Sequence, residues 1–203
     1  MSMDLRAKLM DIRKEEIVRT ATLLFYEKGY TNTSMTDIAQ QLSVGKPYIY
    51  LCFKSKADLL AEVCNTTTAM AAALANEALA SQDTPAERLR HVVEQLCLRV
   101  MDGRMNMSVL FREIKHLPSA ARKELAKNFH SFNHSLKLLL REGVENGEFI
   151  EAEEALVTQA ISGMATWIFA WYNPQGPFTP EHIAQQIASY SLRMVCRQPS
   201  SLD

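Results

Sequence analysis

The sequence predicts an all-α fold, and two features of its composition support this class. The 203 residues include only seven glycines and seven prolines, and most of them interrupt long stretches whose apolar residues recur at helical spacing. Alternating runs of β-branched residues, which are typical of half-buried strands, are nearly absent. With 47% apolar residues, a chain of this length can bury a hydrophobic core without a metal or a disulfide.

Three helices are expected in the N-terminal part of the chain. The first spans about residues 13–28 and ends at Gly29, since glycine is favoured just past a helix. The second begins at Ser34, whose hydroxyl can cap the first amides, and it runs to about Leu42. A three-residue turn then leads into a third helix at Lys46, with a proline in its first turn. Two short helices joined by such a turn form a helix-turn-helix.

Longer helices are expected over the rest of the chain, at about residues 56–80, 85–101, 105–116, 119–146 and 151–172, and from Thr179 onward. The helix at 151–172 has two neighbouring apolar stripes, one through Leu156 and Trp167 and the other through Ile161. A helix that is apolar over so much of its circumference must be covered on more than one side. We therefore expect a homodimer that associates through the last two helices.

The charged residues nearly cancel over the whole chain, but one segment is basic. There are 22 Lys and Arg against 23 Asp and Glu, which gives a formal net charge of −1. Between Lys28 and Lys56, however, there are four lysines and a single acid, Asp37. Because phosphate affinity depends on where the cations lie, this segment can bind nucleic acid despite the neutral total.

The segment from Thr33 to Phe53, TSMTDIAQQLSVGKPYIYLCF, followed by KSKADLL, resembles the DNA-binding segment of the TetR family of bacterial transcription regulators. The residues that carry this resemblance are Ile38, Ala39, Val44, Tyr50, Phe53, Lys56 and Leu59. It implies a DNA-binding domain over residues 11–71, with the motif at about 34–53, and a ligand-binding and dimerisation domain over 72–198. Two positions depart from the family pattern: Ser43 replaces a frequent glycine, and Cys52 replaces a frequent histidine.

The third helix of this motif would present its first turn to the major groove. Lys46 can then reach guanine or phosphate, while Pro47 and Tyr48 can contact thymine methyl groups. The side chains suited by type to anchor phosphate are Thr33, Ser34, Tyr48, Tyr50 and Lys56. The resemblance implies that Tyr50 and Lys56 contact phosphate and that Lys46, Pro47 and Tyr48 face the bases.

The resemblance also implies a small-molecule pocket in the C-terminal half, and adaptable apolar residues are abundant there. The candidate ligand-binding residues are Phe111, Arg112, Phe129, His130, Phe132, Met164, Trp167 and Trp171. Residues 143–190 resemble a subset of the family that represses lipid or steroid catabolism and responds to acyl-CoA thioesters, with Arg112 or Arg141 at the polar end of the ligand. A free fatty acid, an aromatic acid or a cationic amphiphile, as in multidrug-responsive repressors, is the alternative.

Two other classes of protein are considered. His130 and His134 have the spacing of a metal-binding pair on a helix, which is compatible with a helical metal-dependent enzyme. However, the chain lacks an H-E-x-x-H glutamate, a G-x-S-x-G elbow and a Walker lysine, so we expect no catalytic residue, metal or cofactor. A structural helical dimer without a DNA role is the second alternative.

The sequence also bears on where the protein acts. The four cysteines are far apart and form no C-x-x-C pair, which is typical of a reducing compartment. The first residues lack a signal pattern, and no run approaches the roughly 18 apolar residues of a membrane span. We therefore expect a cytoplasmic protein with no membrane association.

Overall fold

The computed structural model describes residues 3–196, except for the side chains of residues 3, 4 and 6, and confirms the all-α class. Within these residues the only β-type pairing is an isolated bridge between Phe149 and Cys196. The chain forms two compact units, and each contains two segments of sequence. The N-terminal unit contains residues 1–67 and 105–125, and the C-terminal unit contains residues 68–104 and 126–203. This division differs from the predicted boundary at 71/72, because residues 105–125 pack with the N-terminal helices.

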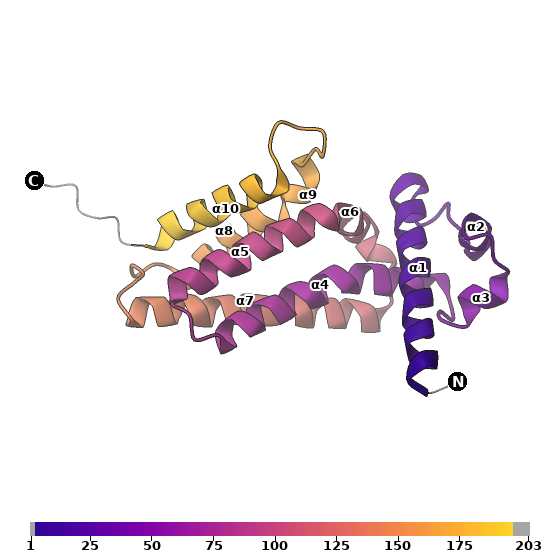
Figure 1. Ribbon diagram of the computed structural model, residues 1–203, viewed down its shortest axis with the longest axis horizontal. Coiled ribbons are helices and arrows are strands. Elements are labelled where there is room, and N and C mark those ends of the chain that lie inside the picture. The colour runs from indigo at the N-terminus through magenta and orange to yellow at the C-terminus, as the bar shows by residue number, and fades with distance from the viewer. Residues whose placement is uncertain (1–2, 197–203) are drawn as a thin grey trace, which may run out of the picture. The chain divides into compact units, whose positions relative to one another are not determined.

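The N-terminal unit begins with the long helix α1 (Met3–Lys28). This helix starts earlier than predicted, because the sequence indicated a start at about residue 13. It ends where predicted, at Gly29, whose φ of 83° suits glycine. The short helices α2 (Met35–Gln41) and α3 (Lys46–Tyr50) follow, and α2 packs against both α1 and α3 (Figure 1). These three helices confirm the predicted helix-turn-helix arrangement.

The α2–α3 turn contains the one non-glycine residue with a positive φ in the described part of the chain, Ser43, with a φ of 55°. A side chain at this φ is strained, because its Cβ approaches the following carbonyl oxygen. Below the turn, the core of the unit is formed by apolar side chains of all three helices: Ile17, Ala21, Leu24, Phe25, Ile38, Ala39, Ile49 and Phe53. Leu42 and Val44, in the turn between α2 and α3, are only half-buried.

The remainder of the N-terminal unit comes from the first turns of α4 (Lys56–Ala80) and from the segment 105–125. This segment contains most of α6 (Arg104–Glu113), the short helix η1 (Ile114–His116) and the first turns of α7 (Ser119–Glu145). Asn106 of α6 donates its side-chain amide to the backbone oxygen of Val63 in α4, at 3.3 Å. The segment is thereby tied to the N-terminal helices by polar contacts as well as by packing.

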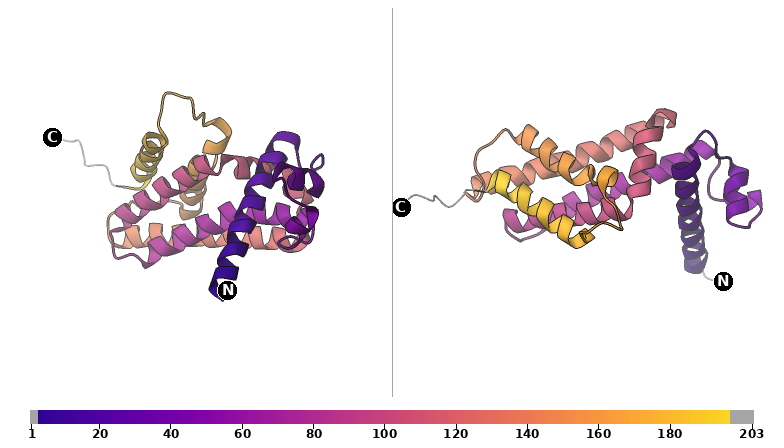
Figure 2. Two further views of the ribbon diagram at one scale, coloured as in Figure 1. Left: turned by 45° about the vertical axis from the view of Figure 1, so that its right-hand side comes forward. Right: turned by 90° about the horizontal axis from the view of Figure 1, so that it is seen from above.

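The C-terminal unit is a bundle in which α10 (Pro180–Val195) lies along α5 (Pro85–Asp102), as both views show (Figure 2). Helix α8 (Glu154–Thr166) packs against α5 and α10. The second half of α4 is joined to α7 by buried polar contacts, in which Asn128 donates to Thr68 at 3.3 Å and Ser135 donates to Asn76 at 2.6 Å. None of the helices in the described part of the chain is long and apolar enough to cross a membrane.

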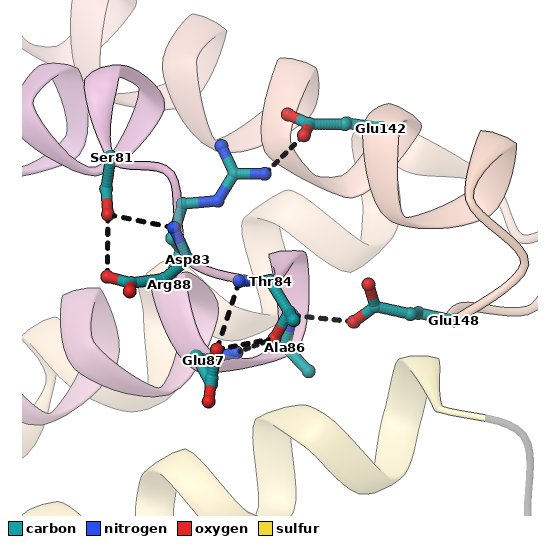
Figure 3. Close-up of polar contacts among 8 residues, drawn as sticks. All are labelled: Ser81, Asp83, Thr84, Ala86, Glu87, Arg88, Glu142 and Glu148. Atoms are coloured by element: carbon teal, nitrogen blue, oxygen red, sulfur yellow. Dashed lines mark hydrogen bonds and ion pairs between the residues drawn. The ribbon is translucent and has the colours of Figure 1, made fainter.

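The start of α5 is held by several hydrogen bonds (Figure 3). The Thr84 hydroxyl accepts from the Glu87 amide and the Glu87 carboxylate accepts from the Thr84 amide, which is a capping box. Glu148, from the turn after α7, accepts from the Ala86 amide at 3.1 Å. The buried Arg88 pairs with Glu142 of α7. These contacts fix the register of α5 on α7.

The turn after α7 is closed by Phe149, whose side chain is only 2% exposed. The Phe149 amide donates to the Gly143 oxygen at 2.9 Å, and the Ile150 amide donates to the Val195 oxygen at 2.7 Å. A Cβ atom on Gly143 would lie 2.1 Å from Cδ2 of the Phe149 ring. Gly143 is therefore required by close packing, not by its backbone angle.

The predicted helix at 151–172 is divided into α8 and the short α9 (Ile168–Trp171), with Trp167 between them. The stripe through Ile161, Ala165 and Ile168 is fully buried inside the unit. In the other stripe, Leu156 is 68% exposed and Trp167 is 57% exposed. The chain itself therefore covers only one of the two apolar stripes.

Candidate DNA-binding site

Helix α3 presents three of the predicted DNA-contacting residues on its exposed side. Lys46 and Pro47, in its first turn, are exposed, and Tyr50 at its end is 49% exposed. Ile49, between them, is fully buried and anchors the helix in the core. This alternation leaves the Lys46 ammonium, the Pro47 ring and the Tyr50 phenol exposed on one side of α3.

Ser34 and Asp37 cap the start of α2. The Asp37 amide donates to the Ser34 hydroxyl at 3.1 Å, and the Ser34 amide donates to the Asp37 carboxylate at 2.7 Å. The Ser34 hydroxyl also donates to this carboxylate, and these hydrogen bonds lower the pKa of Asp37. Ser34 is exposed, so its position permits a phosphate contact, although its hydroxyl is already committed to the cap.

The structure does not support the predicted phosphate contact of Thr33. Its side chain is 1% exposed, and its hydroxyl lies 2.9 Å from the Gly29 oxygen and 3.3 Å from the Leu24 oxygen. Both are carbonyls at the end of α1. Thr33 therefore ties the α1–α2 turn to the end of α1 and is inaccessible to DNA.

Lys56 is also engaged inside the unit, contrary to its predicted role as a simple phosphate contact. Its ammonium donates to the Tyr30 oxygen at 2.9 Å and to the Thr33 oxygen at 2.8 Å. It also lies 4.3 Å from the centre of the Tyr30 ring. The side chain is half-buried, so its first role is to hold the α1–α2 turn against the start of α4.

Tyr48 is turned toward α1 and not toward the exposed side of α3. Its hydroxyl donates to Glu16 at 3.3 Å, and the guanidinium carbon of Arg13 lies 4.3 Å from the centre of its ring. The predicted contact between Tyr48 and bases is therefore not favoured by this arrangement. Sequence reasoning missed Arg13 and Glu16 as partners of Tyr48, because both lie far away from it in the sequence.

Another residue that sequence reasoning missed is Leu51, which directly follows α3 and is 63% exposed. It is next to Tyr50, on a surface that also contains the exposed Lys54. Apolar side chains at such a position can contact thymine methyl groups. The signal was present in the sequence, since a leucine that falls outside the apolar pattern of a short helix needs an explanation.

Arg112, predicted to bind the polar end of a ligand, is instead bonded to the end of α1. Its guanidinium donates to the Phe25 oxygen at 2.7 Å and to the Tyr26 oxygen at 2.9 Å. Cations are favourable at this position, since the last carbonyls of a helix lack helical partners and carry partial negative charge. The prediction is corrected accordingly: Arg112 fastens the end of α6 to α1.

Glu113, the next residue, extends this contact to the α1–α2 turn. It is 8% exposed and accepts from the Tyr30 amide at 3.4 Å. The Tyr30 ring lies 5.2 Å from the His116 ring, centre to centre. Burial, and then the charge of Glu113, raise the pKa of Tyr30. The α1–α2 turn that precedes the helix-turn-helix is thus held on one side by Lys56 and on the other by Glu113.

The other predicted ligand-binding residues are not brought together in one unit. Phe111 and Arg112 belong to the N-terminal unit, and the remaining six belong to the C-terminal unit. Among those six, Phe132 is 6% exposed, whereas Trp167 and Trp171 are more than half exposed. Phe129 and His130 are exposed on α7, and Met164 is half-buried. Only Phe132 and Met164 have the burial expected of an internal pocket.

None of the predicted ligand-binding residues lines the groove or the cavity described next. A groove of about 360 Å³ in the N-terminal unit lies between the starts of α4 and α7. Its lining consists of Asp58, Ala61, Glu62, Asn65, Pro118, Ala120, Ala121 and Glu124. A cavity of about 20 Å³ in the C-terminal unit is large enough only for a water molecule.

Histidines and cysteines were also considered as metal ligands. The rings of His130 and His134 are stacked with their centres 6.1 Å apart. In the part of the chain that the structure describes, no group of three or more His, Cys, Asp or Glu side chains is placed to hold a metal. All four cysteines are free thiols, and burial raises the pKa of Cys64 and of Cys97 to about 12.

Comparison with sequence families gives two matches that together span most of the chain. A model described as bacterial regulatory proteins, tetR family, matches residues 17–63. A model described as a tetracyclin repressor-like C-terminal domain matches residues 82–195. The first match includes the whole helix-turn-helix, and the second includes α5 to α10.

Among curated relatives, the chain is similar to the HTH-type transcriptional repressor KstR2 of Mycolicibacterium smegmatis, with 23% identity over 177 residues and 86% of each chain covered. It is also similar to the HTH-type transcriptional regulator HbdR of Aromatoleum, with 27% identity over 159 residues, 78% of this chain and 69% of the relative.

Two solved structures have a similar fold. The TetR family transcriptional regulator PfmR from Thermus thermophilus has a TM-score of 0.80 and 32% identity, over 87% of this chain and 97% of that one. AibR in complex with isovaleryl coenzyme A and operator DNA has a TM-score of 0.75 and 23% identity, over 88% of this chain and 97% of that one.

Proposed function

The chain belongs to the TetR family of bacterial transcriptional regulators, and from this premise we propose that it is a dimeric, ligand-responsive repressor. It is a regulator and not an enzyme. The observation that carries the proposal is the exposed side of α3, where Lys46, Pro47 and Tyr50 remain available next to a buried anchor.

In the proposed complex, the two α3 helices of a dimer enter successive major grooves about 34 Å apart on a pseudo-palindromic operator. Lys46 binds guanine or phosphate, Pro47 packs on thymine methyl groups and Tyr50 donates to phosphate. Ser34 adds a contact at the start of α2. Lys56 supports this surface by holding the α1–α2 turn, and Thr33 supports it from inside the unit.

The proposed dimer associates through α8 and α10. The exposed stripe of α8 and α9 contains Leu156, Trp167 and Trp171, each more than half exposed, and Tyr190 of α10 is 46% exposed. Exposed apolar surface of this kind is typical of an interface that a second subunit covers.

The proposed effector is an acyl-CoA thioester. AibR, which this fold resembles, has been solved with isovaleryl coenzyme A, and the chain also resembles the KstR2 repressors. The second candidate is a cationic or aromatic amphiphile, as in multidrug-responsive repressors. Arg112 and Glu113 bond α6 to the end of α1 and to the turn before α2. In this proposal, an effector that moves α6 therefore also moves the helix-turn-helix.

Release from the operator follows when the effector prefers the conformer that does not bind DNA. A preference of about 100-fold shifts the equilibrium by roughly 2.7 kcal/mol, which is sufficient for induction. An effector with equal affinity for both conformers would shift nothing.

The DNA-binding part of the proposal is tested with duplexes from the region upstream of the protein's own gene. We expect binding whose affinity falls steeply with salt, because phosphate contacts release counterions. The Lys46→Ala variant should weaken binding and change base preference, and Tyr50→Ala should weaken binding to all sequences. Lys123→Ala, an exposed lysine of α7, is the matched control for the loss of one positive charge. Equal binding by all four proteins would contradict the assigned site.

The effector is tested by thermal shift against acyl-CoA thioesters, free fatty acids and cationic amphiphiles, followed by release of bound operator. An effector that raises the melting temperature and releases the operator at the same concentration supports the proposal. Release by cationic amphiphiles, without any effect of acyl-CoA thioesters, would favour the second candidate.

A further inference from the structure

One aromatic side chain of the recognition helix is held by α1 and does not face outward. Tyr48 is half-buried, its hydroxyl donates to the Glu16 carboxylate at 3.3 Å and its ring lies beneath the Arg13 guanidinium at 4.3 Å. Arg13 and Glu16 are one helical turn apart on α1, so both meet the same face of Tyr48's helix. This inference rests on the proposed DNA-binding function.

The arrangement around Arg13 indicates that its contact with the ring is structural. Arg13 Nε is buried and has no hydrogen-bond partner in the structure, and the guanidinium is only half-exposed. The neighbouring Lys14 pairs with Glu62 of α4 at 2.7 Å and lies 5.9 Å from the centre of the Phe53 ring. One turn of α1 therefore contacts both ends of the segment 48–53.

We propose that Arg13 and Glu16 form a clamp on Tyr48 that sets the angle of α3 relative to α1. Tyr48 is then a positioning residue of the DNA-binding surface, the base contacts belong to Lys46 and Pro47, and Tyr50 contacts phosphate. The Tyr48 hydroxyl is held by its hydrogen bond to Glu16, and the Tyr48 ring is held by its contact with the Arg13 guanidinium. The charges of Arg13 and Glu16 compensate each other, so the clamp presents no net negative charge to phosphate.

The short length of α3 is the physical reason why such a clamp matters. The helix has five residues, fewer than an isolated helix needs to be stable, and Ile49 is its one fully buried side chain. A single apolar anchor leaves rotation about that anchor poorly restrained. A hydrogen bond and a ring contact one position away from Ile49 restrain this rotation, which decides where Lys46 and Tyr50 point.

The test is a double-mutant cycle with Tyr48→Phe and Glu16→Ala in the full-length protein, using operator affinity at a temperature where all variants are folded. Each single variant should weaken binding about fivefold per half-site, the factor that one side-chain hydrogen bond contributes. The double variant should be no weaker than either single one, because both remove the same bond. The base preference, measured by selection from randomised duplexes, should stay that of the wild type.

Two further variants separate a positioning role from charge and from general destabilisation. Glu16→Gln retains a carbonyl oxygen that accepts from Tyr48, so it should restore most of the affinity that Glu16→Ala loses. Glu15→Ala removes an exposed neighbouring charge without touching Tyr48, so its affinity should not fall. A purely structural loss would lower the melting temperature without lowering affinity for DNA in the folded protein.

Three results would overturn the clamp. Losses that add in the double variant would show that the hydroxyl acts independently of Glu16. A changed base preference in Tyr48→Phe would make Tyr48 a base reader. Full affinity in Glu16→Ala would show that the bond does not position α3. If the wild-type protein binds no duplex even in dilute buffer, the proposed function itself fails, which is distinct from these three results.

Discussion

Replacement of Gly143 by alanine tests the close packing of the turn after α7. The new Cβ would lie 2.1 Å from Cδ2, 2.4 Å from Cε2 and 2.7 Å from Cγ of the Phe149 ring, distances that no relaxed structure retains. The ring is 2% exposed, so it must leave its site or move the backbone. Loss of a buried phenylalanine costs about 3–5 kcal/mol, and alanine returns about 1 kcal/mol of helix propensity.

We therefore expect Gly143→Ala to lower the free energy of unfolding by about 2–4 kcal/mol and the melting temperature by roughly 5–15 °C. The assay is urea and thermal unfolding followed by circular dichroism. Gly163→Ala is the matched control, since it is also a helical glycine but has no atom within 4 Å of the new Cβ, and it should be neutral or slightly stabilising. A Gly143→Ala protein as stable as this control would refute the reasoning.

Three other predictions follow from local features. Ser43→Gly should raise the free energy of unfolding by about 0.5–1 kcal/mol in urea titrations, because it relieves a φ of 55°, whereas Gly147→Ala, at a φ of 76°, should lower it. The pKa of Asp37 is lowered in the folded protein, so its cap stabilises the fold above about pH 4 and is lost as the pH falls through that lowered pKa. The free energy of unfolding of Asp37→Asn should therefore differ most from that of the wild type at neutral pH and least in acid. At pH 8, a thiol reagent should modify Cys52 and Cys196 before Cys64 and Cys97. The last two have pKa values of about 12, so they stay protonated, and their burial keeps the reagent away until the protein unfolds. Equal rates of modification for all four cysteines in the native protein would contradict this order.

Features that depend on neighbouring residues could be predicted from the sequence. The cap at Ser34, the helix end at Gly29 and the start of the last helix at Thr179 are confirmed, because each involves atoms within about one turn of the residue that signals it. The three-helix motif and its buried core follow from the same short-range patterns. The two stripes of the helix at 151–172 were also identified, although the interruption at Trp167 has no signal in the sequence.

Features that depend on long-range contacts could not be predicted. Arg112 has the composition of a ligand-binding cation, and only the fold shows that the carbonyls of Phe25 and Tyr26 lie beside it. Lys56 and Thr33 were assigned to phosphate by residue type, but the α1–α2 turn uses both of them. Tyr48 was assigned to the bases by residue type and resemblance, and only the fold shows that Arg13 and Glu16 of α1 lie beside it. For Arg112, Lys56 and Tyr48 the competing partner is far away in the sequence, whereas Thr33 contacts the nearby carbonyls of Leu24 and Gly29.

The discontinuity of the N-terminal unit has a practical consequence for chimeric regulators. A hybrid that exchanges only residues 1–67 with a relative would join a foreign α1 to the native Arg112 and Glu113, whose backbone partners are Phe25, Tyr26 and Tyr30. A hybrid that exchanges residues 105–125 together with residues 1–67 would take both sides of these hydrogen bonds from the same protein. A new operator specificity for this regulator therefore requires the exchange of two segments of the gene and not one.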